Sequence, residues 1–224
     1  MRSRSRYLDQ DQCSWIRDWW RAMQPPTTDR QDVSFALRAL SRGDRAKCRR
    51  CTTLEELEQE LAPNLLAAHL VESSQTRSTW LQKWLQGHHE ALFLLAGVLA
   101  HVEVDAKGNH PLAGRSLVFC LGNAQLKPGA TPRMSERRFK RLLTASGVED
   151  FLRQARRAAQ LADGVADVAV LADDLLAWSI ERDQRERKPS ESLKFRWARD
   201  YYLSAKEQFS PESPNTKSDN ANEI

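Results

Sequence analysis

The chain has 224 residues, of which 41% are hydrophobic, so it can bury a core in one large domain or two small ones. Its net charge is only +4, which excludes a uniformly basic protein of the histone kind. The longest apolar stretch, residues 91–100, is too short to cross a bilayer, and the basic start of the chain leads into a polar segment. We expect a cytoplasmic protein whose four cysteines are reduced thiols.

Apolar residues recur at helical spacing along nearly the whole chain, and alternating strand patterns are almost absent. Residues 45–50 are expected to form a basic connector, and Pro63 is expected to break a helix. The helix expected over residues 88–102 is the most apolar one, which predicts a central position in the core. For the first half of the chain the pattern predicts helices over residues 8–23, 32–40, 52–61, 64–71, 78–86 and 88–102.

The second half is also expected to be helical. Residues 105–111 are expected to form a loop, and residues 122–132, with two glycines and two prolines, the main linker. The segment from Val165 to Trp178 can be read as starting with a strand, but its apolar spacing favours a helix. Helices are predicted over residues 112–121, 132–143, 148–162, 165–180 and 193–209. The prediction is an all-α fold with an N-terminal helical lobe (1–124), a C-terminal helical lobe (125–209) and a disordered tail (210–224).

The charge is concentrated in two blocks. Residues 127–157 hold nine Lys and Arg against three Asp and Glu, and residues 1–52 hold twelve against six. Within 132–143, apolar residues at helical spacing can face a core, while the basic residues form a row with one arginine per turn, about 5–6 Å apart. The like charges in such a row repel one another, and their spacing fits the repeating phosphates of a nucleic acid. The predicted phosphate-binding residues are Arg133, Arg137, Arg138, Lys140 and Arg141, extended onto the following helix by Arg153, Arg156 and Arg157.

Other candidate sites have simpler interpretations. Cys48 and Cys51 have the spacing of half a zinc site, but no second pair accompanies them, so we expect ordinary thiols. His88 and His89, even with His101, lack a ligand set and indicate a polar helix start. The seven tryptophans include pairs at helical spacing beside other apolar residues, which favours the core over base stacking.

An acidic cluster is the remaining candidate for catalysis. Asp163, Asp167, Asp173 and Asp174 resemble a Mg²⁺ nuclease cluster, but a solvated helix face is the favoured interpretation. The sequence has no glycine-rich phosphate loop, nucleophile elbow or catalytic triad signature. We therefore expect no enzyme, no metal, no cofactor and no small-molecule substrate.

Four pieces, in this order along the chain, resemble the CasB family, the small subunit of the type I-E CRISPR surveillance complex Cascade. They are a basic run followed by Thr-x-x-Glu-Leu (45–57), an apolar helix (91–102), the sequence Leu-Ala-Gly-Arg-Ser-Leu (112–117) and the basic helix (134–143). The resemblance covers residues 15–178. The longer N-terminus and the residues after Trp178 depart from the family pattern.

The resemblance implies an all-α protein with two helical lobes and no catalytic site. It implies two copies lying head to tail in Cascade, in contact with other subunits, with the crRNA–target hybrid and with the displaced DNA strand. Holding that strand would stabilise the R-loop. By position in the family motifs, the resemblance adds Arg49, Arg50, Lys107 and Arg115 to the nucleic-acid-binding residues.

Three alternatives stay open from the sequence, and one of them is a metal nuclease that uses the acidic cluster at residues 163–174. Residues 135–145 and 148–162, joined by a turn at Gly147, could form a helix-turn-helix that reads a specific duplex. The chain could also be a structural adaptor whose arginines bind acidic proteins.

Overall fold

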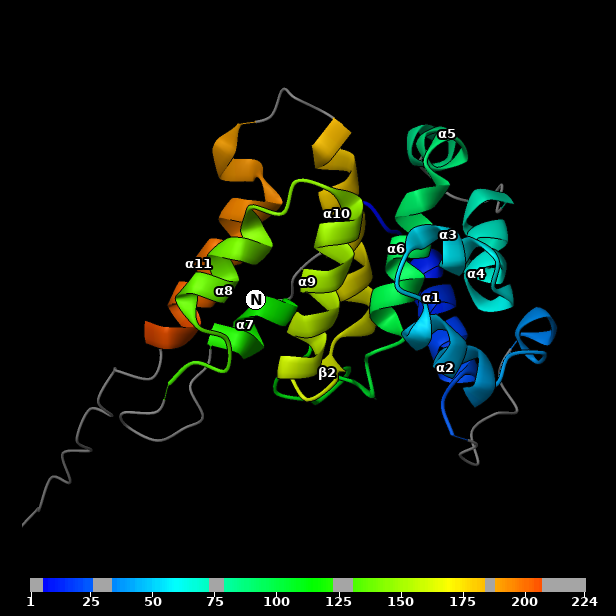
Figure 1. The fold of residues 1–224 in the computed structure, drawn as a ribbon, viewed down its shortest axis with the longest axis horizontal. Helices are drawn as coiled ribbons and strands as arrows, with labels where there is room; N and C mark the ends of the chain where they lie inside the picture. Colours follow the sequence, from blue (N-terminus) through cyan, green and yellow to red (C-terminus); the bar gives the residue numbers. More distant parts are fainter. Residues whose placement is uncertain (1–5, 26–33, 73–78, 123–130, 184–187, 207–224) are drawn as a thin grey trace, which may run out of the picture.

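The computed structural model describes residues 6–25, 34–72, 79–122, 131–183 and 188–206, which are mainly helical (Figure 1). The predicted all-α class is confirmed. Within these residues the helices are α1 (Gln10–Ala22), η2 (Phe35–Leu37), α2 (Arg42–Arg50), α3 (Leu54–Glu58), α4 (Leu61–Glu72), α5 (Thr79–Gly87), α6 (His89–Leu99), α7 (Leu117–Gly122), α8 (Glu136–Leu143), α9 (Val148–Leu161), α10 (Val168–Asp183), η3 (Pro189–Glu191) and α11 (Leu193–Lys206). Most of the predicted linker and the predicted tail lie outside the described residues.

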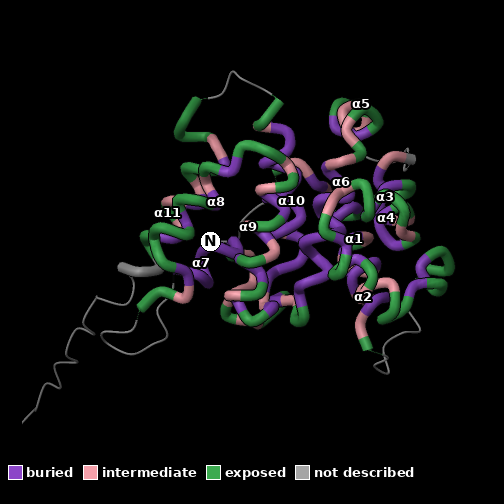
Figure 2. Tube along the Cα trace, viewed as in Figure 1, coloured by how far each residue is buried: buried purple, intermediate pink, exposed green. Residues whose placement is uncertain are grey.

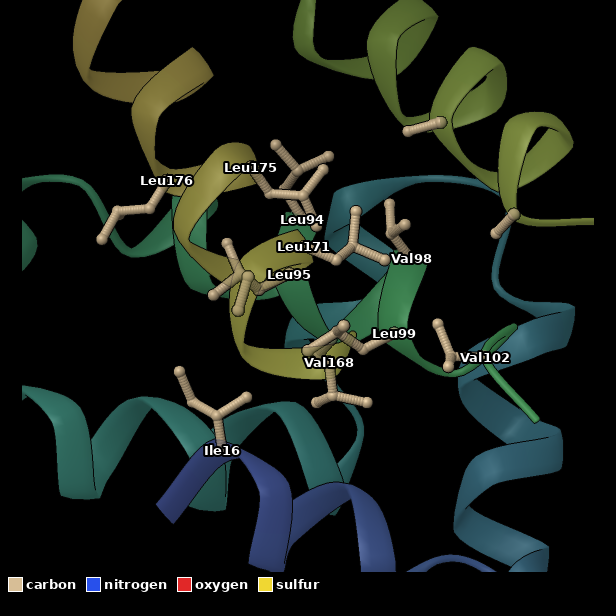
Figure 3. Packing of buried hydrophobic residues seen from close by; sticks show 14 of the residues in the cluster. Ile16, Leu94, Leu95, Val98, Leu99, Val102, Val168, Leu171, Leu175 and Leu176 are labelled. Atoms are coloured by element: carbon tan, nitrogen blue, oxygen red, sulfur yellow. The ribbon is translucent and has the colours of Figure 1, made fainter. Parts of the chain in front are cut away.

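Helix α6 lies at the centre of the core, as its composition predicts. Every residue from Ala91 to Leu99 is buried, and the helix contacts α3, α4, α9 and α10. Figure 3 shows Leu94, Leu95 and Leu99 of α6 packed among side chains of α10 and α1. Burial of apolar surface on this scale supplies the main driving force for folding.

The core is shared by the helices of the two predicted lobes. Helix α7, from the N-terminal range, packs against α11 and α9, while α10 packs against α6 and α1. One continuous cluster of buried side chains runs from Leu8 to Tyr201. The division at 124/125 stays a prediction, and the packing between the two ranges is extensive.

The predicted connector at 45–50 is wrong, because these residues belong to α2. Ser41 precedes the helix, and its main-chain N–H donates to the Asp44 carboxylate at 2.9 Å, while its hydroxyl contacts the same oxygen at 2.7 Å. This cap favours a helix that begins at Arg42. Of the helix predicted over 32–40, the described part contains only η2, and residues 32–33 lie outside the description.

Two helix boundaries differ from the prediction. Pro63 does not break a helix but lies in the first turn of α4, where its missing N–H leaves no hydrogen bond unmade. The helix predicted from residue 112 begins only at Leu117, because Gly114 adopts a left-handed conformation with φ 73°.

A short parallel strand pair replaces the start of the helix predicted from Val165. Strands β1 (Val104–Asp105) and β2 (Val165–Ala166) pair, and the Gly164 carbonyl accepts N–H groups of Glu103 and Val104 at 2.7 and 3.1 Å. Asp163 and Gly164 both have positive φ and end α9, so the chain is extended before α10 begins. The helix prediction is correct only from Val168 onward.

The acidic residues of the candidate nuclease cluster do not form a solvated face. Asp163 is exposed, but Asp167 is buried and accepts hydrogen bonds from the Arg17 guanidinium at 2.6 Å and from the Gly114 N–H at 2.9 Å. Asp105 accepts a further bond from Arg17 at 3.2 Å. This network ties α1 to the loop before α7 and to the start of α10.

The next two carboxylates are also buried and internally engaged. Asp173 accepts the main-chain N–H groups of Arg6, Tyr7 and Leu8 at 2.8–2.9 Å. Asp174 accepts the Trp197 indole N–H at 2.8 Å, and burial raises the pKa of this carboxyl to about 7. These acids hold the structure together, and the favoured interpretation of a solvated face is wrong for them.

The tryptophans lie in the core or against it, as the sequence predicts, with one exception. Trp19, Trp20, Trp178 and Trp197 are buried, and Trp15 and Trp84 are partly buried against the core. Trp80 is 44% exposed. In the part of the chain that the structure describes, no helix is long and apolar enough to cross a membrane.

We expect Gly164→Ala to destabilise the fold by about 1–3 kcal/mol, because φ is +69° and a Cβ atom would lie 2.7 Å from the Glu103 side chain and 3.1 Å from its main-chain nitrogen. Urea unfolding measures this change. Gly87→Ala is the matched control, since nothing lies within 4 Å of its Cβ position. Equal stabilities of the two variants would contradict the prediction.

Candidate nucleic-acid interface

Helix α8 presents a cationic side to solvent. Arg137, Arg138 and Arg141 are exposed, and no described residue forms an ion pair with any of them. On the opposite side Phe139 and Leu142 are buried, and the Phe139 ring stacks on Tyr201 of α11 with centroids 4.1 Å apart. The apolar anchor fixes which side of α8 faces outward, so the three guanidinium groups stay available to a polyanion.

The remaining basic residues of this segment have acidic partners. Helix α8 begins at Glu136 rather than at Pro132, so Arg133 lies before the helix and pairs with Asp163 at the end of α9. Lys140 lies 2.7 Å from Glu136, one turn earlier. The predicted row of one arginine per turn therefore holds only for Arg137 and Arg141, with Arg138 beside them.

Helix α9 carries a second basic side. Arg153 and Arg157 are exposed and lie one turn apart, and Arg153 also contacts Asp150 at 3.3 Å. Helices α8 and α9 contact each other, and exposed residues follow both of them (Figure 2).

Arg156 points the other way and is an internal residue. Its guanidinium donates to the main-chain carbonyls of Gly97 at 3.0 Å, Cys48 at 3.1 Å and Cys51. The last carbonyls of α2 have no partner within that helix, and a cation at this end also stabilises its dipole. Burial lowers the pKa of Arg156. The sequence pattern did not distinguish Arg156 from its neighbours, and its guanidinium is already occupied.

This contact brings α2 against α9. Arg49 and Arg50 lie between the two cysteines whose carbonyls Arg156 binds, and both are exposed. Arg49 pairs with Glu103 at 3.5 Å. The C-terminal end of α2, which carries Arg49 and Arg50, therefore contacts α9 through Arg156, although about a hundred residues separate them in sequence.

Buried His101 lies within this positive field. Burial lowers the pKa of His101 to about 4, and the charges of Arg156, Arg49 and Arg45 lower it further in the same direction. Arg45 is not a surface group, because it donates to the carbonyls of Ala100 and Val102 at 2.9 Å.

Lys107 and Arg115 lie in the segment between β1 and α7, and both are exposed. The Arg115 guanidinium lies 4.4 Å from the centre of the Phe119 ring, which orients its side chain. The Gly114 N–H bond to Asp167 holds the backbone beside it.

The cysteine candidates are internal, and His88 is engaged by its neighbours. The thiols of Cys48 and Cys51 are buried, and burial raises the pKa of Cys48 to about 12, which disfavours the thiolate that binds metals. His88 lies 2.9 Å from Asp183 and stacks on Trp84. Over the described ranges, no group of three or more His, Cys, Asp or Glu residues is arranged to hold a metal ion. The exposed guanidinium groups of Arg137, Arg138 and Arg141 give this side of α8 a positive charge.

Comparison with known proteins places the chain in one family. Residues 44–202 match the family described as CRISPR-associated protein Cse2. A curated relative, CRISPR-associated protein Cse2 of Thermus thermophilus, is 32% identical over 119 residues, which cover 53% of this chain and 60% of the relative. No solved structure matches the chain at a significant level. The matched range includes all twelve basic residues predicted to bind nucleic acid.

We expect Arg156→Ala to destabilise the protein by about 2–4 kcal/mol, because it leaves buried carbonyls of α2 and α6 without their donor. Arg157→Ala, one residue away and exposed, should change stability by less than about 0.5 kcal/mol. Denaturant unfolding of both variants makes the comparison. Similar losses in the two would contradict the assignment of Arg156 to the interior.

The low pKa of His101 predicts a pH dependence of stability. The folded chain keeps His101 neutral, whereas the unfolded chain protonates it below the ordinary value of 6.5, so the free energy of unfolding should fall as pH falls from 6.5 toward about 4. His101→Gln should flatten this part of the profile, and His89→Gln, at an exposed position, should not. An unchanged profile in His101→Gln would count against the prediction.

Proposed function

Because the chain belongs to the CRISPR-associated Cse2 family, we propose that it is a non-catalytic small subunit of a type I-E Cascade complex and binds the nucleic-acid backbone without sequence specificity. The family membership confirms the resemblance drawn from the sequence. The chain spans about 60% of the curated relative, so its partners and activity are part of this proposal.

The observation that carries the proposal is the cationic side of α8. Three exposed guanidinium groups, those of Arg137, Arg138 and Arg141, repel one another and have no acidic partner among the described residues. An arginine binds phosphate through two parallel N–H bonds and keeps its charge at any physiological pH. Phosphate contacts position a nucleic acid without reading its bases, which suits a subunit that must accept any sequence.

Further contacts come from the second basic surface. Arg49 and Arg50 at the end of α2 and Arg153 and Arg157 on α9 are exposed, and the loop residues Lys107 and Arg115 are exposed as well. Some of the cations are expected to contribute less, since each must first leave a carboxylate: Arg133, Lys140, Arg49 and Arg153. Arg156 is not included, because its donors are bound to main-chain carbonyls.

In the proposed complex, pairing with the guide reads the target sequence and this subunit supplies backbone electrostatics. Its partners are other Cascade subunits, a second copy of itself, the crRNA–target hybrid and the displaced strand, in the cytoplasm. A cation-lined surface that holds the displaced strand lowers the free energy of the opened state relative to the closed duplex, and so it opposes re-closure of the R-loop.

The salt dependence of binding tests the proposal. The log–log slope for a single strand is about −0.7 per phosphate contacted, so replacing Arg137, Arg138 and Arg141 by alanine should make it shallower by about 2 and weaken binding equally for all sequences. Fluorescence anisotropy with labelled oligonucleotides over a range of salt concentrations measures this slope.

Lys83→Ala is the control for this experiment, because Lys83 is exposed on α5 and lies in neither basic surface. Preference for one duplex sequence would instead support the helix-turn-helix alternative. Intact complex assembly without any nucleic-acid binding would support the adaptor alternative, and either result would contradict the proposal.

A further inference from the structure

We propose that Phe195 and Tyr202 on α11 form a stacking platform for unpaired bases of a single strand whose phosphates bind α8. The inference rests on the proposed function and adds the kind of strand that this surface selects. The side chains of Phe195 and Tyr202 are 50% and 43% exposed, in a protein that buries most of its large aromatic side chains.

Helix α11 has two distinct sides. Leu193, Trp197 and Tyr201 recur every four residues and are buried. Phe195 and Tyr202 are seven residues apart, so they point within about 20° of each other, away from that buried side and about 10 Å apart along the axis. Arg199, also exposed, lies between them on the same side. Two rings with a cation between them form a line on the surface of α11.

Tyr202 is held against α8 in one orientation. Its hydroxyl donates to the Glu136 carboxylate at 3.0 Å, and its ring lies nearly perpendicular to the rings of Phe139 and Tyr201, at 85° and 88°. A ring fixed in this way loses little conformational entropy when a base stacks on it. The same contact places Tyr202 at the edge of α8.

The Tyr202 ring is followed around α8 by that helix's cations. From Glu136, which touches Tyr202, rotation by 100° per residue leads first to Lys140, then to Arg137 and Arg141. The charge of Glu136 does not oppose a phosphate strongly, because the Lys140 ammonium lies 2.7 Å from its carboxylate and offsets that charge. Helices α8 and α11 lie side by side, and both carry exposed residues (Figures 1 and 2).

The chemistry of this surface favours a single strand as its occupant. Adjacent guanidinium groups without ion-pair partners favour an anionic occupant over an apolar protein surface. Exposed rings bind the faces of bases, and these faces are free in a single strand but already stacked in a duplex. A displaced strand offers both phosphates and unpaired bases, so it uses the whole of this surface.

Binding of two oligonucleotides to the full chain tests the inference: oligothymidine, and an abasic strand with the same phosphates and no bases. Stacking contributes about 1–3 kcal/mol per base, so Tyr202→Ala should weaken oligothymidine binding about 5- to 150-fold and leave abasic binding and the salt slope unchanged. Phe195→Ala should act in the same direction. Tyr202→Phe keeps the ring and should retain most of the affinity.

Phe35→Ala is the matched control, since this ring is 83% exposed on η2, which contacts α1 rather than α8. Equal affinity of Tyr202→Ala, Phe195→Ala and the unchanged protein for oligothymidine would overturn the inference, while the α8 arginine variants would still test the proposed function separately. Loss of complex assembly without loss of oligothymidine binding would assign the rings to a protein contact and also overturn it. Failure of the unchanged chain to bind either strand would reject both proposals.

Discussion

Burial of α6 is the constraint on which the rest of the structure depends. An eleven-residue helix that is apolar on every side must be covered all around, and it is covered by helices from both halves of the chain. Each covering helix packs its apolar side against α6 and turns its polar side outward. The basic side of α9 is exposed for this reason. Helix α8 contacts α9 and stacks Phe139 on Tyr201 of α11, so its cationic side also faces outward.

Charged groups inside the molecule have a different role from those outside. Arg156 binds the end of α2, Arg17 joins Asp105 and Asp167, and Asp173 holds the N-terminal segment. Each of these groups meets hydrogen-bond partners that compensate for its loss of water. An arginine therefore stabilises the fold at one position and is exposed to solvent at the next, as Arg156 and Arg157 illustrate.

The proposed strand-binding surface would combine two interactions that differ in range. Guanidinium groups attract phosphates over about 8–10 Å at physiological salt, which increases the rate of encounter with a strand. Aromatic rings act only at contact and only on bases that have left a duplex. A surface with both properties would gather any nucleic acid but retain an opened strand longest, which is the property that R-loop stabilisation requires.

The amino-acid sequence by itself determined the helical class, the central position of α6 and the amphipathic character of α8, because these follow from local periodicity of apolar residues. It did not determine which arginines are free. Arg153, Arg156 and Arg157 look alike in the sequence, and only the approach of α2 to α9 turns Arg156 inward. The buried carboxylates and the pairing of β1 with β2 were missed for the same reason: their partners are distant in sequence, and only the folded chain brings them within hydrogen-bonding distance.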